Sequence, residues 1–323
     1  MNLTTNSVLR GVLFGIAASA LALGTGATGV LAQETVRIGL ATKTWFPTVI
    51  AEAAQQQGFF KNEGINAELT VYQSGAETFT SLAAGSADVI STSPNIIATG
   101  RVRGVNAKMV LKGSSGNLGW HLIVPTKSKV QDAKELDGKN VGITSAGSLS
   151  DSLALWTMET KGIKFTTVPL GAGLAPNLIS GNVEAAVIYS PLSFKVIKDG
   201  DGRSILDYGA AMPAHLNSGF AASDAFIDEK PELLKKTVKA LLGGLAYLQD
   251  NRESAVKLIA EINDIPADIA EQEYENVFLK LSRTGEMTLA EVEQAFDLYR
   301  LGGMKDFPPA AEMFTNAAIP GAN

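Results

Sequence analysis

Apolar residues follow two different periods along the chain from residue 33 onward. Short runs of period two, typical of strands, alternate with amphipathic stretches that stop at a glycine, as helices do. The first part of this alternation predicts a strand at 36–40, a helix at 46–57, a strand at 67–71, a helix at 76–84 and a strand at 88–91. Units of this kind form a mainly parallel sheet flanked by helices, so the predicted fold class is α/β.

A short pattern in this region occurs a second time further along the chain. Residues 82–89 and 178–185 both place a glycine after a helix and an acidic residue before an apolar strand. Glycine suits the left-handed position that ends a helix. The simplest interpretation is that one structural unit occurs twice, once in each of two lobes. Seven further strands are expected, at 107–111, 122–124, 141–144, 165–168, 185–189, 205–207 and 219–222.

The last third of the chain has the period of helices. One apolar face follows Pro231, and further helices are expected from about Arg252, from Pro266 and from Thr288. Thr288 and Glu291 form the pattern of a capping box at the start of the last helix. We expect this part to support one lobe and to carry no catalytic group. The apolar face consists of Leu234, Val238, Leu241, Leu245 and Leu248.

Composition fits a globular protein with two cores. The chain has 323 residues, of which 46% are hydrophobic and 19% charged, and single cores rarely grow beyond about 250–300 residues. The formal net charge is −6, and no run of basic residues offers a surface for phosphate backbones, which excludes nucleic acid as a partner. Because cysteine is absent, thiol catalysis and iron–sulfur clusters are excluded as well.

The first 32 residues predict a compartment. Arg10 is their only charged residue, and an apolar stretch at 12–23 is followed by small residues up to Ala32. This order is typical of a secretory signal peptide, which we expect to be cleaved before Gln33. An uncleaved membrane anchor is the alternative, but glycines interrupt the stretch and its strictly apolar part is shorter than a span requires. We therefore expect a monomeric periplasmic protein.

Motifs of the common enzyme classes are missing from the sequence. It has no G-x-S-x-G elbow and no phosphate-binding P-loop. Its two histidines, His121 and His215, lie far apart and have no neighbours at metal-ligand spacing. We therefore expect no catalytic residue, no metal site and no cofactor.

Polar turns follow several of the predicted strands. In open α/β sheets these turns border the crevice where ligands bind, and a helix that begins there directs free backbone N–H groups at the ligand. The turns occupy residues 44–47, 73–76, 92–95, 144–148 and 189–191. Their recurrence after successive strands makes them the candidate binding site.

Four segments carry a family resemblance that extends from about Val36 to Asp250. They are GFFKNEGI at 58–65, Ser74-Gly75 leading to LAAGSADV at 82–89, LDGKNVG at 136–142 and GNVEAA at 181–186. The chain thereby resembles the solute-binding proteins of ABC importers in the nitrate, sulfonate and taurine group. The wider family includes binding proteins for thiamine-pyrimidine precursors, the THI5-like or NMT1 family.

This resemblance implies a two-lobed periplasmic-binding-protein fold of type II. Two crossovers would join the lobes, which would close over a small-molecule ligand and deliver it to an ABC permease in the inner membrane. Lobe one would comprise residues 33–121 and 217–323, and lobe two residues 122–216.

Candidate ligand-binding residues come from the turns and from the resemblance. The resemblance implies Trp45, Phe46, Ser74, Gly75, Ser93, Pro94, Ser145, Ala146, Gly147, Ser148, Tyr189 and Ser190, and the chemistry of the residues adds Gln73, Trp120 and Asn217. Backbone N–H groups and hydroxyls suit a carboxylate or a sulfonate, while the aromatic rings suit an apolar ligand body.

The charge of the ligand is the least determined property. The turns contain no arginine, and Lys43 is the only cation near one of them. Sulfonate binders of this group often have an acidic residue before the proline of the 189–191 turn and a lysine in the 144–148 turn. Ser190 and Ser145 occupy those places here, so sulfonate specificity does not carry over. We expect a small organic anion with an apolar part; the alternatives are a neutral heterocycle such as a pyrimidine, an enzyme on the same fold, and a partner of a membrane sensor.

Overall fold

The computed structural model describes residues 33–322, and these residues form one compact unit. The predicted signal peptide and its cleavage after Ala32 lie outside the described residues. Within them, no helix has both the length and the apolar character needed to cross a bilayer.

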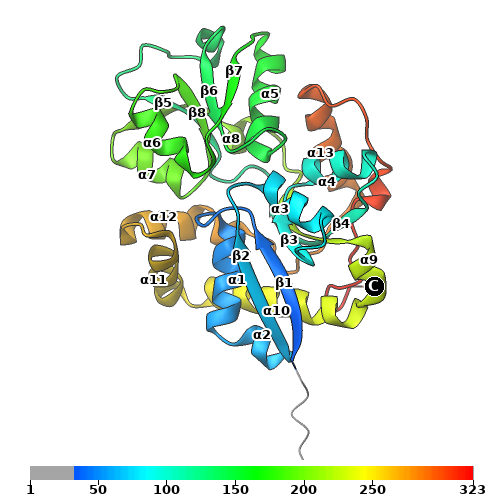
Figure 1. Cartoon of the computed structure of the whole chain (residues 1–323). Coiled ribbons are helices and arrows are strands. Elements are labelled where there is room, and N and C mark those ends of the chain that lie inside the picture. Colours follow the sequence, from blue (N-terminus) through cyan, green and yellow to red (C-terminus); the bar gives the residue numbers. More distant parts are fainter. Residues whose placement is uncertain (1–32, 323) are drawn as a thin grey trace, which may run out of the picture. The chain divides into compact units, whose positions relative to one another are not determined.

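Two five-stranded sheets organise the chain (Figure 1). The first sheet has the order β2-β1-β3-β10-β4 and the second the order β7-β6-β8-β5-β9. The strands are β1 (Glu34–Leu40), β2 (Ile65–Val71), β3 (Val89–Thr92), β4 (Ala107–Ser115), β5 (His121–Pro125), β6 (Asn140–Ile143), β7 (Thr166–Pro169), β8 (Ala185–Ile188), β9 (Gly202–Asp207) and β10 (Leu216–Ser223). All ten strands predicted from the sequence are confirmed, with small shifts at the strand ends.

One strand in each sheet runs against the other four. β10 is antiparallel to β3 and β4, and β5 is antiparallel to β8 and β9. The chain forms β5 and β10 directly after it crosses from the other sheet. Each of these two strands therefore begins at the end of its sheet where the other four strands finish. The prediction of mainly parallel sheets is confirmed, and each sheet also contains one antiparallel strand.

Helices cover both faces of the first sheet. α1 (Phe46–Gln56), α2 (Phe59–Asn62) and α10 (Pro231–Asp250) pack together on one side. α3 (Gly75–Ala83), α4 (Pro94–Val102) and α13 (Leu289–Leu301) lie on the other. β10 alternates between the two cores, since Phe220 and Ala222 join the cluster of α1 and α10 whereas Ala221 joins that of α4 and α13. We call this sheet and its helices the first lobe.

The second lobe consists of the second sheet with α5 (Leu149–Lys161), α6 (Leu174–Ile179), α7 (Leu192–Lys198) and α8 (Tyr208–Ala211). Three helices remain, namely α9 (Asp224–Glu229), α11 (Arg252–Asn263) and α12 (Ala267–Asn276). α11 packs on α1 and α10, and α12 packs on α11 but also reaches α7, while α13 reaches α5. The lobes are therefore in contact, and the boundaries at 121/122 and 216/217 stay a prediction.

The repeated pattern in the sequence corresponds to a repeated structure. Gly85 and Gly181 end α3 and α6 in the left-handed conformation, with φ of 69° and 74°. The Asp88 carboxylate accepts the backbone N–H of Arg37 on β1, and Glu184 accepts that of Asn140 on β6, both at 2.9 Å. β3 and β8 hold the same place in their sheets, so one unit occurs once in each lobe, as predicted.

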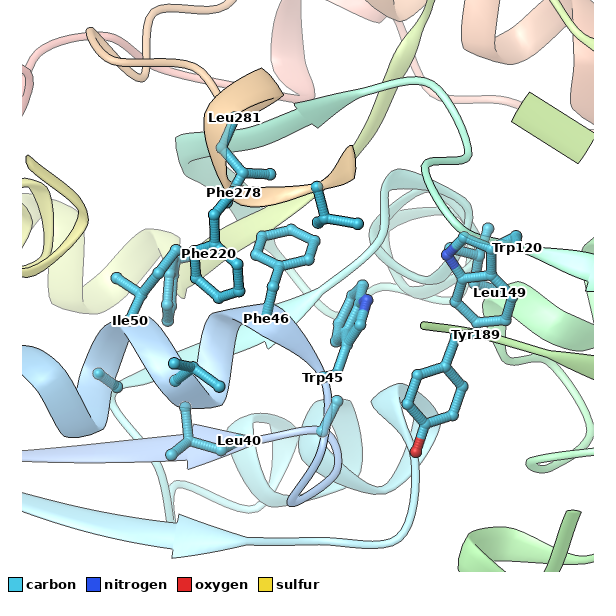
Figure 2. Packing of buried hydrophobic residues seen from close by; sticks show 14 of the residues in the cluster. Leu40, Trp45, Phe46, Ile50, Trp120, Leu149, Tyr189, Phe220, Phe278 and Leu281 are labelled. Carbon is cyan, nitrogen blue, oxygen red and sulfur yellow. The ribbon is translucent and has the colours of Figure 1, made fainter. Parts of the chain in front are cut away.

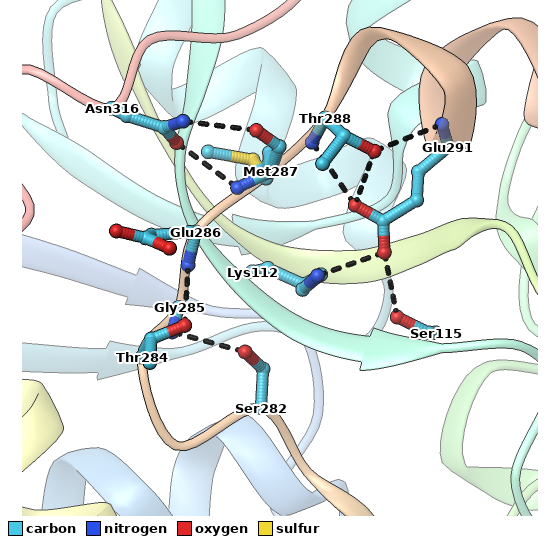
Figure 3. Close-up of polar contacts among 10 residues, drawn as sticks. All are labelled: Lys112, Ser115, Ser282, Thr284, Gly285, Glu286, Met287, Thr288, Glu291 and Asn316. Carbon is cyan, nitrogen blue, oxygen red and sulfur yellow. Dashed lines mark hydrogen bonds and ion pairs between the residues drawn. The ribbon is translucent and has the colours of Figure 1, made fainter. Parts of the chain in front are cut away.

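The predictions for the C-terminal helices are also confirmed. The five predicted core positions of α10 are at most 4% exposed, and α13 begins with the predicted capping box of Thr288 and Glu291. Figure 3 shows that the Glu291 carboxylate also accepts from Lys112 Nζ at 2.8 Å and from Ser115 Oγ at 3.0 Å. These two bonds hold the start of α13 against β4.

Candidate functional site

A small cavity lies where the carboxyl ends of β1, β2, β3, β6 and β8 meet. Trp120 completes it, because this residue precedes β5, whose reversed direction puts its start at the same edge. The space open to the centre of a water molecule is about 30 Å³, enough for only a few waters. The cavity is lined by Ala41, Thr42, Trp45, Ser74, Gly75, Thr92, Ser93, Ile96, Trp120, Thr144, Ser148, Leu149 and Tyr189.

Four helices begin at the wall of this cavity. Trp45, Ser74, Ser93 and Ser148 are the N-cap residues of α1, α3, α4 and α5. The first N–H groups of a helix have no partner within it, and the helix dipole favours negative charge at this end. α1 and α4 have no acidic residue in their first turn, so nothing on these helices offsets that preference.

The wall itself carries no ionised side chain. Among the described residues that line the cavity there is no aspartate, glutamate, lysine, arginine or histidine. Tyr189 is the one titratable group, and burial raises the pKa of its hydroxyl, which stays neutral at pH 7. Any charge that a ligand brings is therefore met by dipoles and hydrogen-bond donors rather than by a counter-charge.

Aromatic rings form two sides of the cavity. Trp45 packs edge-on against Phe46 with 5.3 Å between ring centroids, and Trp120 packs against Tyr189 at 5.4 Å. Figure 2 shows the indole nitrogens of Trp45 and Trp120 turned toward the space between the two rings. Each indole supplies apolar area together with one N–H donor.

The cavity hydroxyls of the two lobes differ in whether their protons are free to form a hydrogen bond with a ligand. Ser74 Oγ accepts from the backbone N–H of Glu77 at 3.2 Å, which leaves its own proton free to donate. Ser148 Oγ instead lies 2.8 Å from both Thr144 Oγ1 and Ser150 Oγ, and these two oxygens are 2.9 Å apart. In such a triangle each hydroxyl has a neighbouring oxygen to which it can donate its proton.

Seven of the predicted site residues line the cavity. They share a position at a strand end or at the first residue of a helix. They are Trp45, Ser74, Gly75, Ser93, Trp120, Ser148 and Tyr189.

The other candidates from the first lobe and the crossovers have different surroundings. Phe46 packs beside Trp45 but lies in the core near Phe220 and Phe278 (Figure 2). Pro94 is buried as the first residue of α4. Gln73 is exposed just before the N-cap of α3. The Asn217 side chain donates to Asn117 Oδ1 at 2.5 Å, so it joins the two crossovers rather than lining the cavity.

The remaining candidates from the second lobe lie beside the cavity without lining it. Ala146 and Gly147 are exposed, Ser145 is half-buried, and the backbone N–H of Gly147 donates to Asp151 Oδ2 at 2.8 Å. This N–H group, which the sequence analysis predicted to bind the ligand, is therefore already bonded to a carboxylate of the protein. Ser190 packs against Gly119, where an added Cβ would lie 2.5 Å from the serine hydroxyl oxygen.

Six lining residues were not among the candidates. Ala41 and Thr42 directly follow β1, while Ile96 and Leu149 lie in the first turns of α4 and α5. Thr92 and Thr144 lie inside predicted turns, and the Thr92 hydroxyl is buried with no hydrogen-bond partner among the described residues. Extending each predicted turn by one helical turn would have found Ile96 and Leu149.

Fold and cavity together correspond to a two-lobed periplasmic-binding-protein fold with a cavity between the lobes. The family model described as NMT1/THI5 like matches residues 49–255, and the chain belongs to this family. The resemblance predicted from the four motifs is thereby confirmed. No group of acidic, histidine or cysteine side chains among the described residues could hold a metal ion.

The proteins that this chain is similar to include binding proteins for sulfonates and nitrate. A putative aliphatic sulfonates-binding protein of Bacillus subtilis (strain 168) is 25% identical over 276 residues, which is 83% of this chain and 82% of the relative. The structure of the alkanesulfonate-binding protein SsuA from Xanthomonas axonopodis pv. citri bound to MOPS superposes with a TM-score of 0.74 at 18% identity, over 86% of this chain and 97% of that one. The periplasmic nitrate-binding protein NrtA from Synechocystis PCC 6803 gives a TM-score of 0.62 at 19% identity, over 74% and 69%.

Proposed function

We propose that the chain is an exported solute-binding protein of an ABC importer, which captures a small organic anion with an apolar part between its lobes. One observation carries this proposal: four helices from both lobes begin at a cavity whose wall has no ionised side chain. Helix starts and hydroxyl donors favour an anion over a neutral molecule. A neutral heterocycle would use the aromatic rings but would gain little from the dipoles.

Capture requires the lobes to move. A cavity this small admits an organic anion only after the lobes separate. A ligand that touches both lobes binds the closed form better than the open one, and this difference drives closure. Micromolar affinity corresponds to about −8 kcal/mol. Four or five hydrogen bonds to a charged group, at roughly 1.5–3 kcal/mol each and less the ordering costs, are sufficient.

The names of the relatives support an oxyanion but leave its kind open. Two are named for sulfonates and one for nitrate. All are 25% identical or less, and Ser145 and Ser190 stand where sulfonate binders of the group often have a lysine and an acidic residue. We therefore include carboxylates beside sulfonates in the proposal.

Four probes that share a six-membered aromatic ring test the charge of the ligand. Isothermal titration calorimetry would compare benzenesulfonate, benzoate, neutral benzenesulfonamide and 4-aminopyrimidine. We expect micromolar or tighter binding of at least one anion, and binding at least tenfold weaker for benzenesulfonamide. Tighter binding of 4-aminopyrimidine than of either anion would favour the heterocycle binder.

Turnover and export need separate measurements. Native mass spectrometry of the protein as purified would identify a retained ligand, and release of a chemically altered product over time would favour an enzyme on this fold. Expression of the full chain in a Gram-negative host should give a periplasmic protein whose N-terminal sequence begins at Gln33. An uncleaved protein in the membrane fraction would contradict the proposed export.

A further inference from the structure

Asn95 joins the two lobes directly behind the cavity. It is the second residue of α4 in the first lobe and is 3% exposed. Its Nδ2 lies 3.0 Å from Ser152 Oγ and 3.3 Å from the carbonyl oxygen of Gly147, both in the second lobe. One buried amide group thus donates across the gap between the lobes.

The other end of the same amide is tied to the cavity wall. Asn95 Oδ1 accepts the hydroxyl of Ser93 at 2.5 Å, and Ser93 lines the cavity. Because the amide nitrogen only donates and the amide oxygen only accepts, the chain of bonds runs from Ser93 through Asn95 to the start of α5. The side chain of Asn95 itself does not line the cavity.

These bonds to the second lobe exist only while the lobes are in contact. If α5 moved away from α4, the amide would exchange Ser152 and Gly147 for water. A group that bonds in one state and is solvated in the other shifts the balance between the states by its net hydrogen-bond energy. Two other bonds join the lobes elsewhere: Thr44 Oγ1 lies 3.1 Å from the Tyr189 hydroxyl, and Lys198 on α7 pairs with Asp268 on α12.

We propose that Asn95 is a positioning residue that holds the lobes closed and thereby sets how long a ligand stays bound, without touching the ligand. The expected consequence, slow ligand release, rests on the proposed function. Its structural part, the stabilisation of the closed form, applies to the protein without ligand as well.

The structural part is tested without any ligand. The chain has no cysteine, so V102C on α4 and I179C on α6 provide two unique sites for spin labels. The native side chains at these positions are 47% and 49% exposed. Pulsed electron–electron double resonance then reports the distribution of distances between the lobes. We expect Asn95→Ala to lower the ratio of closed to open molecules by about three- to tenfold.

Thr99→Ala is the matched control. Thr99 is one turn further along α4, and its hydroxyl donates to the backbone carbonyl of Asn95 at 2.9 Å, within the same helix. This variant should leave the distances unchanged. Equal distributions in the parent and the Asn95→Ala protein, or equal shifts in both variants, would overturn the proposal.

The kinetic part uses benzenesulfonate and stopped-flow tryptophan fluorescence. Asn95→Ala should release the probe about three- to tenfold faster with little change in the association rate. Ser152→Ala should act in the same direction but more weakly, and the double variant should exceed Asn95→Ala only slightly, because both remove one bond. Additive effects would show that the two residues act independently and would contradict the proposed contact.

The two proposals fail in different ways. If benzenesulfonate does not bind the parent protein, the proposed ligand class is in doubt while the spin-label distances still decide the role of Asn95. If the probe binds and both the distances and the release rate are unchanged in Asn95→Ala, the proposed function stands and the role of Asn95 is refuted.

Discussion

The two lobes share a scaffold but present different chemistry to the cavity. Their sheets have corresponding strand orders, and each contains the same helix–glycine–strand unit. In the first lobe, Ser74 has a proton to donate and the starts of α1 and α4 have no acidic residue. In the second lobe, the hydroxyl of Ser148 is bonded to those of its neighbours, and Asp151 occupies the N–H of Gly147.

This difference separates two tasks that one fold can combine. Backbone geometry brings the same strand ends to the gap in both lobes, whereas the side chains decide what they offer there. We infer that the first lobe supplies most of the binding energy for an anion, while the second lobe closes the site and orients the ligand. Four predictions test the two lobes and the contact between them, from the largest expected effect to the smallest.

The largest effect is expected at the contact between the lobes. Glu273 on α12 is 1% exposed, its carboxylate has no hydrogen-bond partner among the described residues, and burial raises its pKa to about 8. The folded protein therefore keeps a proton on Glu273 at pH values where the unfolded chain, with a pKa of 4.5, has lost it. Stability should fall as the pH rises from 4.5 to 8, by up to about 5 kcal/mol.

Glu273→Gln should remove this loss. In urea unfolding between pH 5 and pH 8.5, the free energy of unfolding of the variant should increase relative to that of the parent protein as the pH rises. Glu275→Gln is the control, because this residue lies on the same helix but its side chain is 47% exposed. Parallel pH profiles for the parent and the Glu273 variant would contradict the assignment.

Loss of an aromatic wall should cost about 2 kcal/mol of binding free energy, or roughly 30-fold in Kd. Trp45→Ala is expected to reach this value, because it removes both apolar area and the N–H donor beside the start of α1. Trp120→Ala makes the same change on the opposite side of the cavity. Trp156→Phe is the control, since the third tryptophan of the chain packs on Tyr208 in the second lobe. Titration of benzenesulfonate gives the affinities, and an unchanged Kd for Trp45→Ala would make that ring a structural residue.

Two serines compare the lobes directly. Ser74 and Ser148 both cap a helix, so either alanine variant should lose about 1 kcal/mol of stability. Ser74→Ala should weaken anion binding by roughly tenfold or more, since a hydrogen bond to a charged group contributes about 1.5–3 kcal/mol. Ser148→Ala should change Kd much less, because its proton is used within the triangle of hydroxyls. Equal losses of affinity in calorimetric titrations would refute the division of tasks between the lobes.

The limits of sequence reasoning have physical causes. Strands such as β8 were predicted because continuous burial requires a continuous apolar run. The reversed directions of β5 and β10 were not, because they depend on where the chain crosses between sheets. Trp45 and Phe46 are neighbours in sequence, but the first faces the cavity and the second the core. The contact of Asn95 with the second lobe joins residues more than fifty positions apart, and no local sequence pattern predicts it.

The smallest effect is expected where α13 is attached to the first lobe. Burial alone would raise the pKa of Glu291, but its bonds with Lys112, Thr288 and Ser115 outweigh burial and lower it. The ionised carboxylate therefore stabilises the fold above its ordinary pKa of 4.5, and this contribution is lost as the pH falls below that value.

Glu291→Gln should therefore cost about 1 kcal/mol at pH 7, and the difference from the parent protein should shrink toward pH 3. Thermal unfolding at the two pH values measures it. Anion affinity should be unchanged, because Glu291 lies on α13 against the end of β4 and not at the cavity. A variant that lost affinity without losing stability would show that α13, which also contacts α5 of the second lobe, controls closure as well as supporting the first lobe.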